Sequence, residues 1–269
     1  MAEQGNNINK KKLSIRISRD ALLFATYNPT LDPQLEYEPY VNNSRISIAA
    51  NLREAVKEVN LALQTYYRVH VMLDAPSLLV PLEEFQEDTV EALYQHSFPY
   101  KDNEEVTYNV LPYLNAVSVF SINKDLNLVL KDNFRTFHLF TTAAPIWHHL
   151  HTRSFTGVHR KLYGYFHDKI LEIFCFNQNR FKFANSYEAP HSHDAIYFLL
   201  YVWKQLNMDA EKDELHIAGD IPEKDWLISE LRKYLRNAFI INPSADFNRN
   251  AVTQVNMPYD FQTLLVCGR

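Results

Sequence analysis

One order of elements occurs twice in this chain of 269 residues, and that repeat restricts the possible folds more than any other feature of the sequence. The heptapeptide HVMLDAP at 70–76 returns as HIAGDIP at 216–222, with His, Asp and Pro in the same three places. Before each heptapeptide the chain carries three strand-like segments and one amphipathic helix. We therefore expect an internal duplication, in which each heptapeptide ends the fourth strand of its copy and turns the chain toward a helix.

The first copy begins with a strict alternation of apolar and polar residues at 13–18, which is the period of a half-buried strand. A tight turn at Ser18-Arg19-Asp20 leads to an apolar second strand, and the alternating residues 34–40 predict a third. A helix is expected next, because apolar residues fall at steps of three and four. They form one stripe: Ile48, Leu52, Val56, Val59 and Leu63.

The second copy repeats this order in its own residues. Residues 162–188 predict three strands, with a tight turn at His167-Asp168-Lys169 between the first two. A helix is predicted at 192–207, with Ser192 as its N-cap, and a fourth strand at 213–220. The two copies therefore match element by element, with a drift of only a few residues in register.

Both copies then alternate helices and strands, but the first copy makes a detour from Ser77 to about Ile122. The detour contains an acidic helix at roughly Glu84 to His96 and two alternating strands, so we interpret it as a small inserted subdomain. Three parts are then expected: a flexible polar tail at 1–12, a first domain at 13–155 with the insertion at about 77–122, and a second domain at 156–269.

Composition excludes several classes of protein. Hydrophobic residues make up 46% of the chain, which is enough for a packed core, and the net charge is −5. The only basic cluster is Lys10 to Lys12, so the broad basic surface of a nucleic-acid-binding protein is missing from the sequence. The chain opens without an apolar signal segment and has no apolar run of membrane-spanning length. We expect a soluble cytoplasmic protein with no nucleic-acid partner and no membrane insertion.

Three antiparallel strands, a helix and then alternating parallel strands and helices resemble the ribonuclease-H-like topology, and two such domains in tandem resemble the actin-like ATPase fold. The sequence is similar to an uncharacterised bacterial family, a domain of unknown function with this fold. Its architecture also resembles the actin-like assembly platforms of type IV pilus and type II secretion machines. The resemblance implies a duplicated α/β fold of two mixed-sheet domains, whereas fold alone does not imply an activity.

The resemblance also implies where a nucleotide would bind. Actin-like ATPases hold ATP and Mg²⁺ between their domains, with a glycine-containing phosphate loop in the first hairpin of each domain, because only glycine lets backbone N–H groups approach phosphate closely. Neither hairpin turn of this chain contains glycine. Asp168 and Lys169 could contact Mg²⁺ and a phosphate, or could simply form a turn. Gly219 and Asp220 stand where the adenosine contact is expected, or Gly219 could serve only a close turn at the end of a strand.

Other constellations give weaker signals. The histidines of WHHLHTR (His148, His149 and His151) and the stretch HSHD at 191–194 could share a zinc ion if they met, or could be ordinary helix-surface histidines. Cys175 and Cys267 stand among apolar residues, so buried free thiols without an activating neighbour are expected.

Two further enzyme classes are disfavoured. No serine stands in a G-x-S-x-G turn. A two-metal nuclease would use Asp74 and Asp220 at strand ends, but it also needs a carboxylate from a first strand, and these strands supply none. We therefore assign no catalytic residue and no metal site.

The expected insertion has an unusual charge. Eight carboxylates lie between Pro81 and Glu105, against the single basic residue Lys101. They are Glu83, Glu84, Glu87, Asp88, Glu91, Asp102, Glu104 and Glu105. Apolar side chains are interleaved with them: Phe85, Leu93, Tyr94, Phe98 and Tyr100. Such a segment could be a protein-docking surface, or a solvated helix face whose aromatic residues pack inward.

These observations favour an actin-like-fold protein without catalytic activity, a pseudoenzyme that acts in protein–protein interaction or assembly, with the insertion as the contact surface. The alternative is a degenerate adenine-nucleotide-binding protein or weak ATPase, with Asp168, Lys169, Gly219 and Asp220 as the remaining contacts to ATP and Mg²⁺. The sequence does not identify the protein partner or the oligomeric state.

Overall fold

The protein is described by a computed structural model over residues 11–99 and 101–268. Most of the expected polar tail, Tyr100 and Arg269 lie outside the described residues. The chain forms two compact units. The first contains the residues up to Leu111, Val117–Ala144 and Leu264–Val266, and the second contains Pro112–Ala116, Pro145–Thr263, Cys267 and Gly268. The domain boundary at 155/156 stays a prediction.

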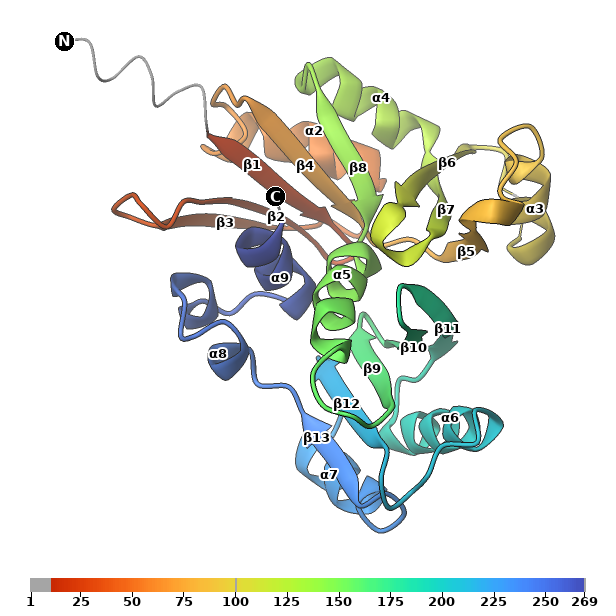
Figure 1. Cartoon of the computed structure of the whole chain (residues 1–269). Helices are drawn as coiled ribbons and strands as arrows, with labels where there is room; N and C mark the ends of the chain where they lie inside the picture. The colour runs from red at the N-terminus through yellow and green to blue at the C-terminus, as the bar shows by residue number, and fades with distance from the viewer. Residues whose placement is uncertain (1–10, 100, 269) are drawn as a thin grey trace. The chain divides into compact units, whose positions relative to one another are not determined.

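A five-stranded mixed sheet in the order β3-β2-β1-β4-β8 forms the centre of the first unit (Figure 1). β1 and β2 form an antiparallel hairpin, whereas β4 and β8 run parallel to β1. Ser14 and Arg16 of the central strand β1 are buried, although the alternating pattern predicted that this side would face solvent. The strands span Lys12–Ile17 (β1), Ala21–Tyr27 (β2), Leu35–Val41 (β3), Arg68–Leu73 (β4) and Phe137–Thr141 (β8).

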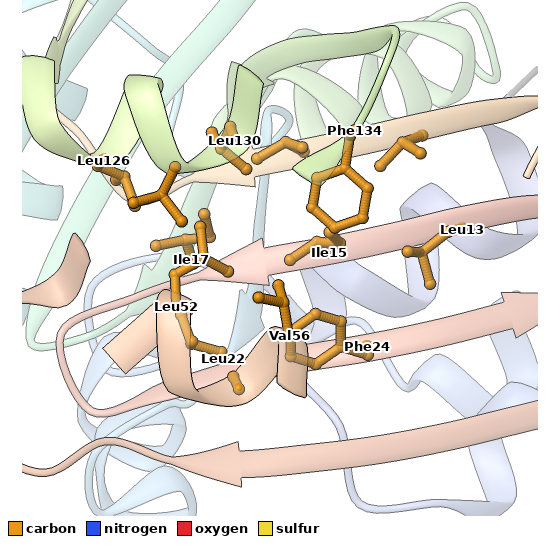
Figure 2. Packing of buried hydrophobic residues seen from close by; sticks show 14 of the residues in the cluster. Leu13, Ile15, Ile17, Leu22, Phe24, Leu52, Val56, Leu126, Leu130 and Phe134 are labelled. Atoms are coloured by element: carbon orange, nitrogen blue, oxygen red, sulfur yellow. The ribbon is translucent and has the colours of Figure 1, made fainter. Parts of the chain in front are cut away.

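Helices α2 (Ile48–Glu58) and α4 (Lys124–Asn133) pack against this sheet and form one apolar cluster with it. Figure 2 shows Leu52 of α2 and Leu126 of α4 approaching Ile17 of β1 from two directions. Asn123 caps α4 through its side chain, which accepts a hydrogen bond from the Leu126 N–H.

Helix α2 is shorter than the apolar stripe predicted. It ends at Glu58, where the Val59 N–H closes the last turn on the Ala55 carbonyl. The next N–H, of Asn60, donates to the Glu38 carboxylate at 2.8 Å, which draws the chain off the helical path. Leu63, the last residue of the predicted stripe, is consequently 63% exposed.

The insertion is a three-stranded sheet in the order β5-β7-β6, with helix α3 packed against it through its own apolar cluster (Figure 1). The predicted acidic helix is shorter than expected: a 3₁₀ turn spans Leu82–Glu84, and α3 begins only at Val90. The elements span Ser77–Pro81 (β5), Leu82–Glu84 (η2), Val90–Ser97 (α3), Glu104–Leu111 (β6), Pro112–Leu114 (η3) and Ala116–Asn123 (β7).

The second unit contains a sheet in the order β11-β10-β9-β12-β13, which matches the first sheet strand for strand. Its hairpin β9–β10 is antiparallel, and β12 and β13 run parallel to β9. Helices α6 and α7 cover one face through an apolar cluster. The elements span Lys161–His167 (β9), Ile170–Asn177 (β10), Arg180–Glu188 (β11), Ser192–Gln205 (α6), Glu214–Gly219 (β12), Lys224–Leu231 (α7) and Asn237–Ile240 (β13).

Ser192 is not the N-cap of α6. It is the first helical residue and is completely buried, and its hydroxyl donates to the Glu223 carboxylate at 2.5 Å instead of capping the helix. The remaining elements span Ala143–Ser154 (α5), Pro243–Asp246 (α8), Ala251–Gln254 (η4) and Tyr259–Cys267 (α9). Among the described residues, no helix combines the length and the hydropathy needed to cross a membrane.

Two mixed sheets with the same strand order, flanked by helices, confirm the predicted α/β class and the insertion in the first copy. The heptapeptide repeat also has its expected place, because it begins within β4 in one sheet and within β12 in the other. A duplication event as the origin of this symmetry stays a prediction.

Candidate functional site

The four residues proposed for a nucleotide site lie at one edge of the second sheet. Asp168 and Lys169 form the turn between β9 and β10, and Gly219 and Asp220 follow one another at the end of β12. β9 and β12 are parallel neighbours with Phe166 opposite Gly219, and the Asp220 N–H donates to the Phe166 carbonyl at 2.9 Å. The fold therefore brings the two segments together at the carboxyl ends of adjacent strands.

The β9–β10 turn is tight. Asp168 and Lys169 have φ values of 45° and 67°, and they alone connect the paired residues His167 and Ile170. Positive φ at both central positions is the geometry of a type I′ hairpin turn. The Lys169 carbonyl already accepts the Ala189 N–H at 2.9 Å. A two-residue connection cannot curve around a triphosphate as a longer, glycine-containing loop does.

Gly219 has a structural reason to be glycine. Its φ is +91°, and a Cβ atom built there would lie 2.0 Å from the Phe166 carbonyl oxygen. Any other residue would clash with the neighbouring strand and would also adopt an unfavourable backbone conformation. The close turn at the strand end is thus sufficient to explain this glycine without a ligand.

Two further ionisable residues, which the sequence analysis did not select, lie beside Asp168. His167 is 5% exposed, and its ring nitrogens lie 3.4 Å from an Asp168 carboxylate oxygen and 3.3 Å from one of Glu172. Glu172 is on β10 and is also buried. The Tyr165 ring stacks on His167 with centroids 4.9 Å apart. This arrangement can orient the Asp168 carboxylate, and the imidazole can donate a hydrogen bond to either acid.

The pattern of strand β9 contained a partial signal for this cluster. Alternation along the strand places Tyr165 and His167 on the same face, two residues apart. Glu172 lies opposite Tyr165 in the antiparallel register, but that pairing depends on the turn having two residues rather than three. The cluster could be found only after the turn length was known.

The histidines proposed for zinc have other partners. His149 lies 2.7 Å from the Asp246 carboxylate, His151 lies 2.9 Å from the Gln178 carbonyl, and the ring of His193 packs against Trp226. Over residues 11–99 and 101–268, the WHHLHTR and HSHD histidines do not gather into a group of three or more potential ligands. Burial lowers the pKa of His148, with smaller contributions from His151 and His149.

The insertion separates its aromatic and acidic side chains. Tyr94 is buried with Val80, Val90, Val117 and Val119, and Phe85 and Phe98 pack against this cluster. The Tyr94 hydroxyl donates to the Pro76 carbonyl at 3.1 Å, which ties α3 to the start of the module.

Most of the insertion carboxylates stay at the surface: Glu83, Glu84, Glu87, Asp88, Glu91 and Asp102 are exposed. Glu104 differs, because it accepts hydrogen bonds from Ser121 at 2.5 Å and from Lys101 at 2.9 Å. Burial opposes its ionisation, but these two donors outweigh that effect and lower its pKa. The inward packing expected as one alternative is present, and six of the eight carboxylates remain exposed.

Comparisons with known proteins agree with this architecture. The model of a family described as "Protein of unknown function (DUF3822)" matches residues 3–238. A solved Bacteroides thetaiotaomicron protein "with actin-like ATPase fold and unknown function" is 31% identical, with a TM-score of 0.83 over 97% of this chain and 98% of that one. This match confirms the predicted fold and the predicted similarity to an uncharacterised family.

Two more distant structures were also found, and the first of them has the same fold. A chain of the PilM–PilN type IV pilus biogenesis complex is 13% identical, with a TM-score of 0.60 over 95% of this chain and 97% of that chain. The cytoplasmic domain of EpsL, an inner membrane component of the Vibrio cholerae type II secretion system, is 10% identical, with a TM-score of 0.43 over 79% and 84% of the two chains. No curated protein matches the chain.

Proposed function

The chain belongs to the family of proteins of unknown function DUF3822, and we propose that it is a non-catalytic protein of actin-like fold that binds another protein in the cytoplasm. The proposed contact surface is the acidic face of the insertion. We define this acidic face by its exposed carboxylates: Glu83, Glu84, Glu87, Asp88, Glu91 and Asp102.

The observation that carries this proposal is the concentration of negative charge on one small module. Residues 81–105 hold eight carboxylates against one lysine, a net charge of −7, whereas the whole chain has a net charge of only −5. Like charges repel one another, and a cationic partner that neutralises them lowers this unfavourable energy. The excess of acid is therefore a property of the insertion and not of the protein as a whole.

The insertion also holds these carboxylates on a folded unit of one sheet and helix α3. Its sheet and α3 share an apolar cluster, which packs the elements of the insertion against one another. Leu82 and Leu93 are 41% and 42% exposed within the same segment. Exposed apolar side chains among carboxylates fit a partner segment that combines Lys or Arg with apolar residues.

Charge reversal tests the proposal. In the source organism, the intact protein is compared with the triple variant Glu83→Lys, Glu84→Lys, Glu87→Lys by affinity purification and quantitative mass spectrometry. A matched control changes three exposed acids outside the insertion: Glu58→Lys, Asp132→Lys and Asp225→Lys. We expect a partner with a basic segment that is retained by the intact protein and the control but lost with the insertion variant. The purified partner should then bind directly and more weakly as salt rises.

Partner sets that are the same for all three proteins would contradict the proposed surface. A partner lost equally with the control variant would show a dependence on total charge and not on the insertion. The PilM–PilN complex is an assembly of the type IV pilus machinery; the likeness at 13% identity extends to the fold, and the partner of this chain is to be found by the experiment.

A second candidate function is residual binding of ATP or ADP with Mg²⁺ at the edge of the second sheet. It is favoured by the convergence of Asp168 and Lys169 with Gly219 and Asp220 at the ends of β9 and β12. In this alternative, Lys169 would contact a phosphate, Asp168 would hold Mg²⁺ through water, and the Gly219–Asp220 backbone would face the nucleoside.

Thermal denaturation with millimolar Mg²⁺ and ATP or ADP distinguishes the two functions. Stabilisation by more than about 1 kcal/mol would favour nucleotide binding. The variants Asp168→Asn and Lys169→Gln should then remove the shift, because both residues lie in an exposed turn and asparagine tolerates positive φ. Lys212→Gln, at an exposed position elsewhere in the second unit, is the matched control. No shift with either nucleotide would support the non-catalytic alternative.

A further inference from the structure

In the second unit, a thiol contacts an imidazole, and the imidazole contacts a carboxylate. The Cys267 Sγ atom lies 3.6 Å from the Nδ1 atom of His149, which is hydrogen-bond reach for the large sulfur atom. The other ring nitrogen of His149, Nε2, lies 2.7 Å from an Asp246 carboxylate oxygen. The three residues come from α9, α5 and α8, and the fold brings His149 to Asp246 and Cys267, which lie 97 and 118 positions later in the chain.

Asp246 determines the proton arrangement of this group. Its side chain is 3% exposed; it accepts a hydrogen bond from the Tyr259 hydroxyl at 2.6 Å and forms an ion pair with the Arg153 guanidinium. A carboxylate surrounded by donors holds the His149 proton on Nε2, which leaves Nδ1 as an acceptor directed at sulfur. This is the tautomer that a base needs if it is to remove the thiol proton.

The imidazole is also held in place by packing. The ring of His149 lies 5.3 Å from that of Phe247 and 6.4 Å from that of Tyr259, and these two aromatic rings stack on each other. The His149 side chain is 14% exposed, so rotation away from Cys267 would require the aromatic cluster to open. Cys267 is free and partly exposed, so a small reagent can reach it.

The other cysteine lacks these features. Cys175 is buried in β10 among apolar residues, and burial raises the pKa of its thiol to about 11. It behaves as the sequence analysis expected of both thiols. Cys267 is also a free thiol, as expected, but it is only partly buried and has a polar neighbour from a distant helix.

We propose that Cys267 is a reactive nucleophilic thiol, with His149 as its base and Asp246 as the group that orients the base, and that it forms mixed disulfides with small-molecule disulfides. This substrate class is the one that the geometry serves best. Disulfide exchange needs a thiolate, a proton acceptor and access, whereas acyl transfer also needs N–H donors for an oxyanion. The inference does not depend on the proposed docking function.

The reaction balances with a disulfide as the only co-reactant. The proton of Cys267 moves to His149 Nδ1, and the sulfur electron pair attacks one sulfur of the disulfide. An S–S bond forms to Cys267 while the original S–S bond breaks, and the departing thiolate takes the proton from His149. The products are a mixed disulfide on the protein and one equivalent of free thiol, and an excess of thiol reverses the reaction.

The probe for a test is 4,4′-dithiodipyridine, a small neutral disulfide whose leaving group is measured by absorbance. The folded full-length protein is mixed with the probe at pH 7, and peptide mass spectrometry locates the adduct. We expect one fast equivalent at Cys267, loss of this phase in Cys267→Ser, and a rate at least about tenfold lower in His149→Gln. His148→Gln is the matched control, because His148 is on the same helix but packs against Tyr113. Its rate should equal that of the unmodified protein.

The pH dependence gives a second test that needs no variant. A thiol coupled to an imidazole keeps reacting at a nearly constant rate as pH falls below 8, whereas an isolated thiol slows about tenfold per pH unit below its pKa near 8.5. An isolated-thiol profile in the unmodified protein would overturn the proposal, even if His149→Gln failed to fold. Equal rates for folded His149→Gln and His148→Gln would also overturn it.

Discussion

The two sheets have the same strand order, yet their first hairpins differ in chemistry. In the first unit, the Asn42 side chain donates to the carbonyls of Ser18 and Arg19, both at 3.0 Å, and closes the β1–β2 turn with polar contacts. In the second unit, the Ala189 N–H donates to the Lys169 carbonyl of the turn. Ala189 has no side-chain amide that could add further hydrogen bonds. Side-chain hydrogen bonds from Asn42 thus close the first turn, whereas the second has positive φ at both central residues and accepts a backbone hydrogen bond from Ala189.

The residues beside the two hairpin turns also differ in chemistry. Where the second sheet has the buried pair His167 and Glu172, the corresponding register positions of the first sheet hold Ser18 and Leu23. Where β12 ends in Gly219, β4 ends in Leu73. Equal topology has therefore been filled with different chemistry, because a buried His–Glu pair stands at the second edge where the first has Ser18 and Leu23.

The largest effect that we predict for this contrast is at the end of β12. Gly219→Ala should lower the free energy of unfolding by about 4 kcal/mol, because it adds both a clash with the Phe166 carbonyl and backbone strain. Gly164→Ala is the control within the same sheet: its Cβ would approach only side-chain atoms, at 3.1 Å or more, so the loss should be smaller. Urea unfolding measures both. A loss below about 1 kcal/mol at Gly219 would mean that the strand end can move away.

The two cores should respond alike, in contrast to the two edges. Leu52 on α2 and Leu199 on α6 are both completely buried, each in the centre of its apolar cluster. Either Leu→Ala change should cost about 3 kcal/mol through lost burial and the cavity left behind. Chemical denaturation monitored by circular dichroism compares them. A large cost in one unit and almost none in the other would show that the units are not equivalent in packing.

Much of the fold follows from local patterns in the sequence. The repeat of HVMLDAP as HIAGDIP marks the ends of β4 and β12 because a strand buried on both sides and a turn that follows it have strong local signatures. Helix ends were less predictable. The end of α2 depends on the distant Glu38 carboxylate, and the start of α6 depends on Glu223, and neither is visible in the local sequence.

The candidate sites divide in the same way. Asp168 and Gly219 were selected because the resemblance to actin-like ATPases implies nucleotide contacts at these strand ends, and the strand ends themselves follow from local periodicity. Cys267 was assigned apolar surroundings because its neighbours along α9 are apolar, whereas its partner His149 is 118 positions earlier in the chain. Contacts of that separation are created by tertiary packing and leave no spacing signal in one sequence.

A smaller effect is expected from removing the side-chain hydrogen bonds that close the β1–β2 turn. Asn42→Ala removes both hydrogen bonds to the β1–β2 turn and should cost about 1–2 kcal/mol, because the Ser18 and Arg19 carbonyls lose their donors. Ser18 keeps its own contact with the Ala21 carbonyl, which limits the loss. Thermal denaturation gives the value, and Asn28→Ala, in the exposed loop after β2, is the control. If Asn42→Ala left the free energy of unfolding unchanged, water would have replaced the amide, and the Asn42 side chain would not make the first turn more stable than the second.

The smallest predicted effect concerns the histidines that begin the two heptapeptides. Burial lowers the pKa of His70 to about 4, with His138, Lys12 and Arg68 adding to the shift. Burial also lowers the pKa of His216, but Glu214, 2.8 Å away, partly offsets it. A depressed histidine pKa means that the unfolded chain binds the proton more readily. Its contribution to stability is therefore present above the ordinary pKa near 6.5 and is lost as pH falls toward 4.

His70→Gln should consequently make the protein less sensitive to acid than His216→Gln does. Between pH 7 and pH 5.5, the two variants are expected to differ by less than about 1 kcal/mol in how much their free energy of unfolding changes, once solvent screening is allowed for. Urea unfolding of both variants and the unmodified protein at these two pH values measures it. If the pH dependence of the free energy of unfolding became weaker by the same amount in both variants, the Glu214 carboxylate would not offset the lowered pKa of His216. A steeper loss in His70→Gln would show that His70 is protonated in the folded state, with a nearby acid as its partner.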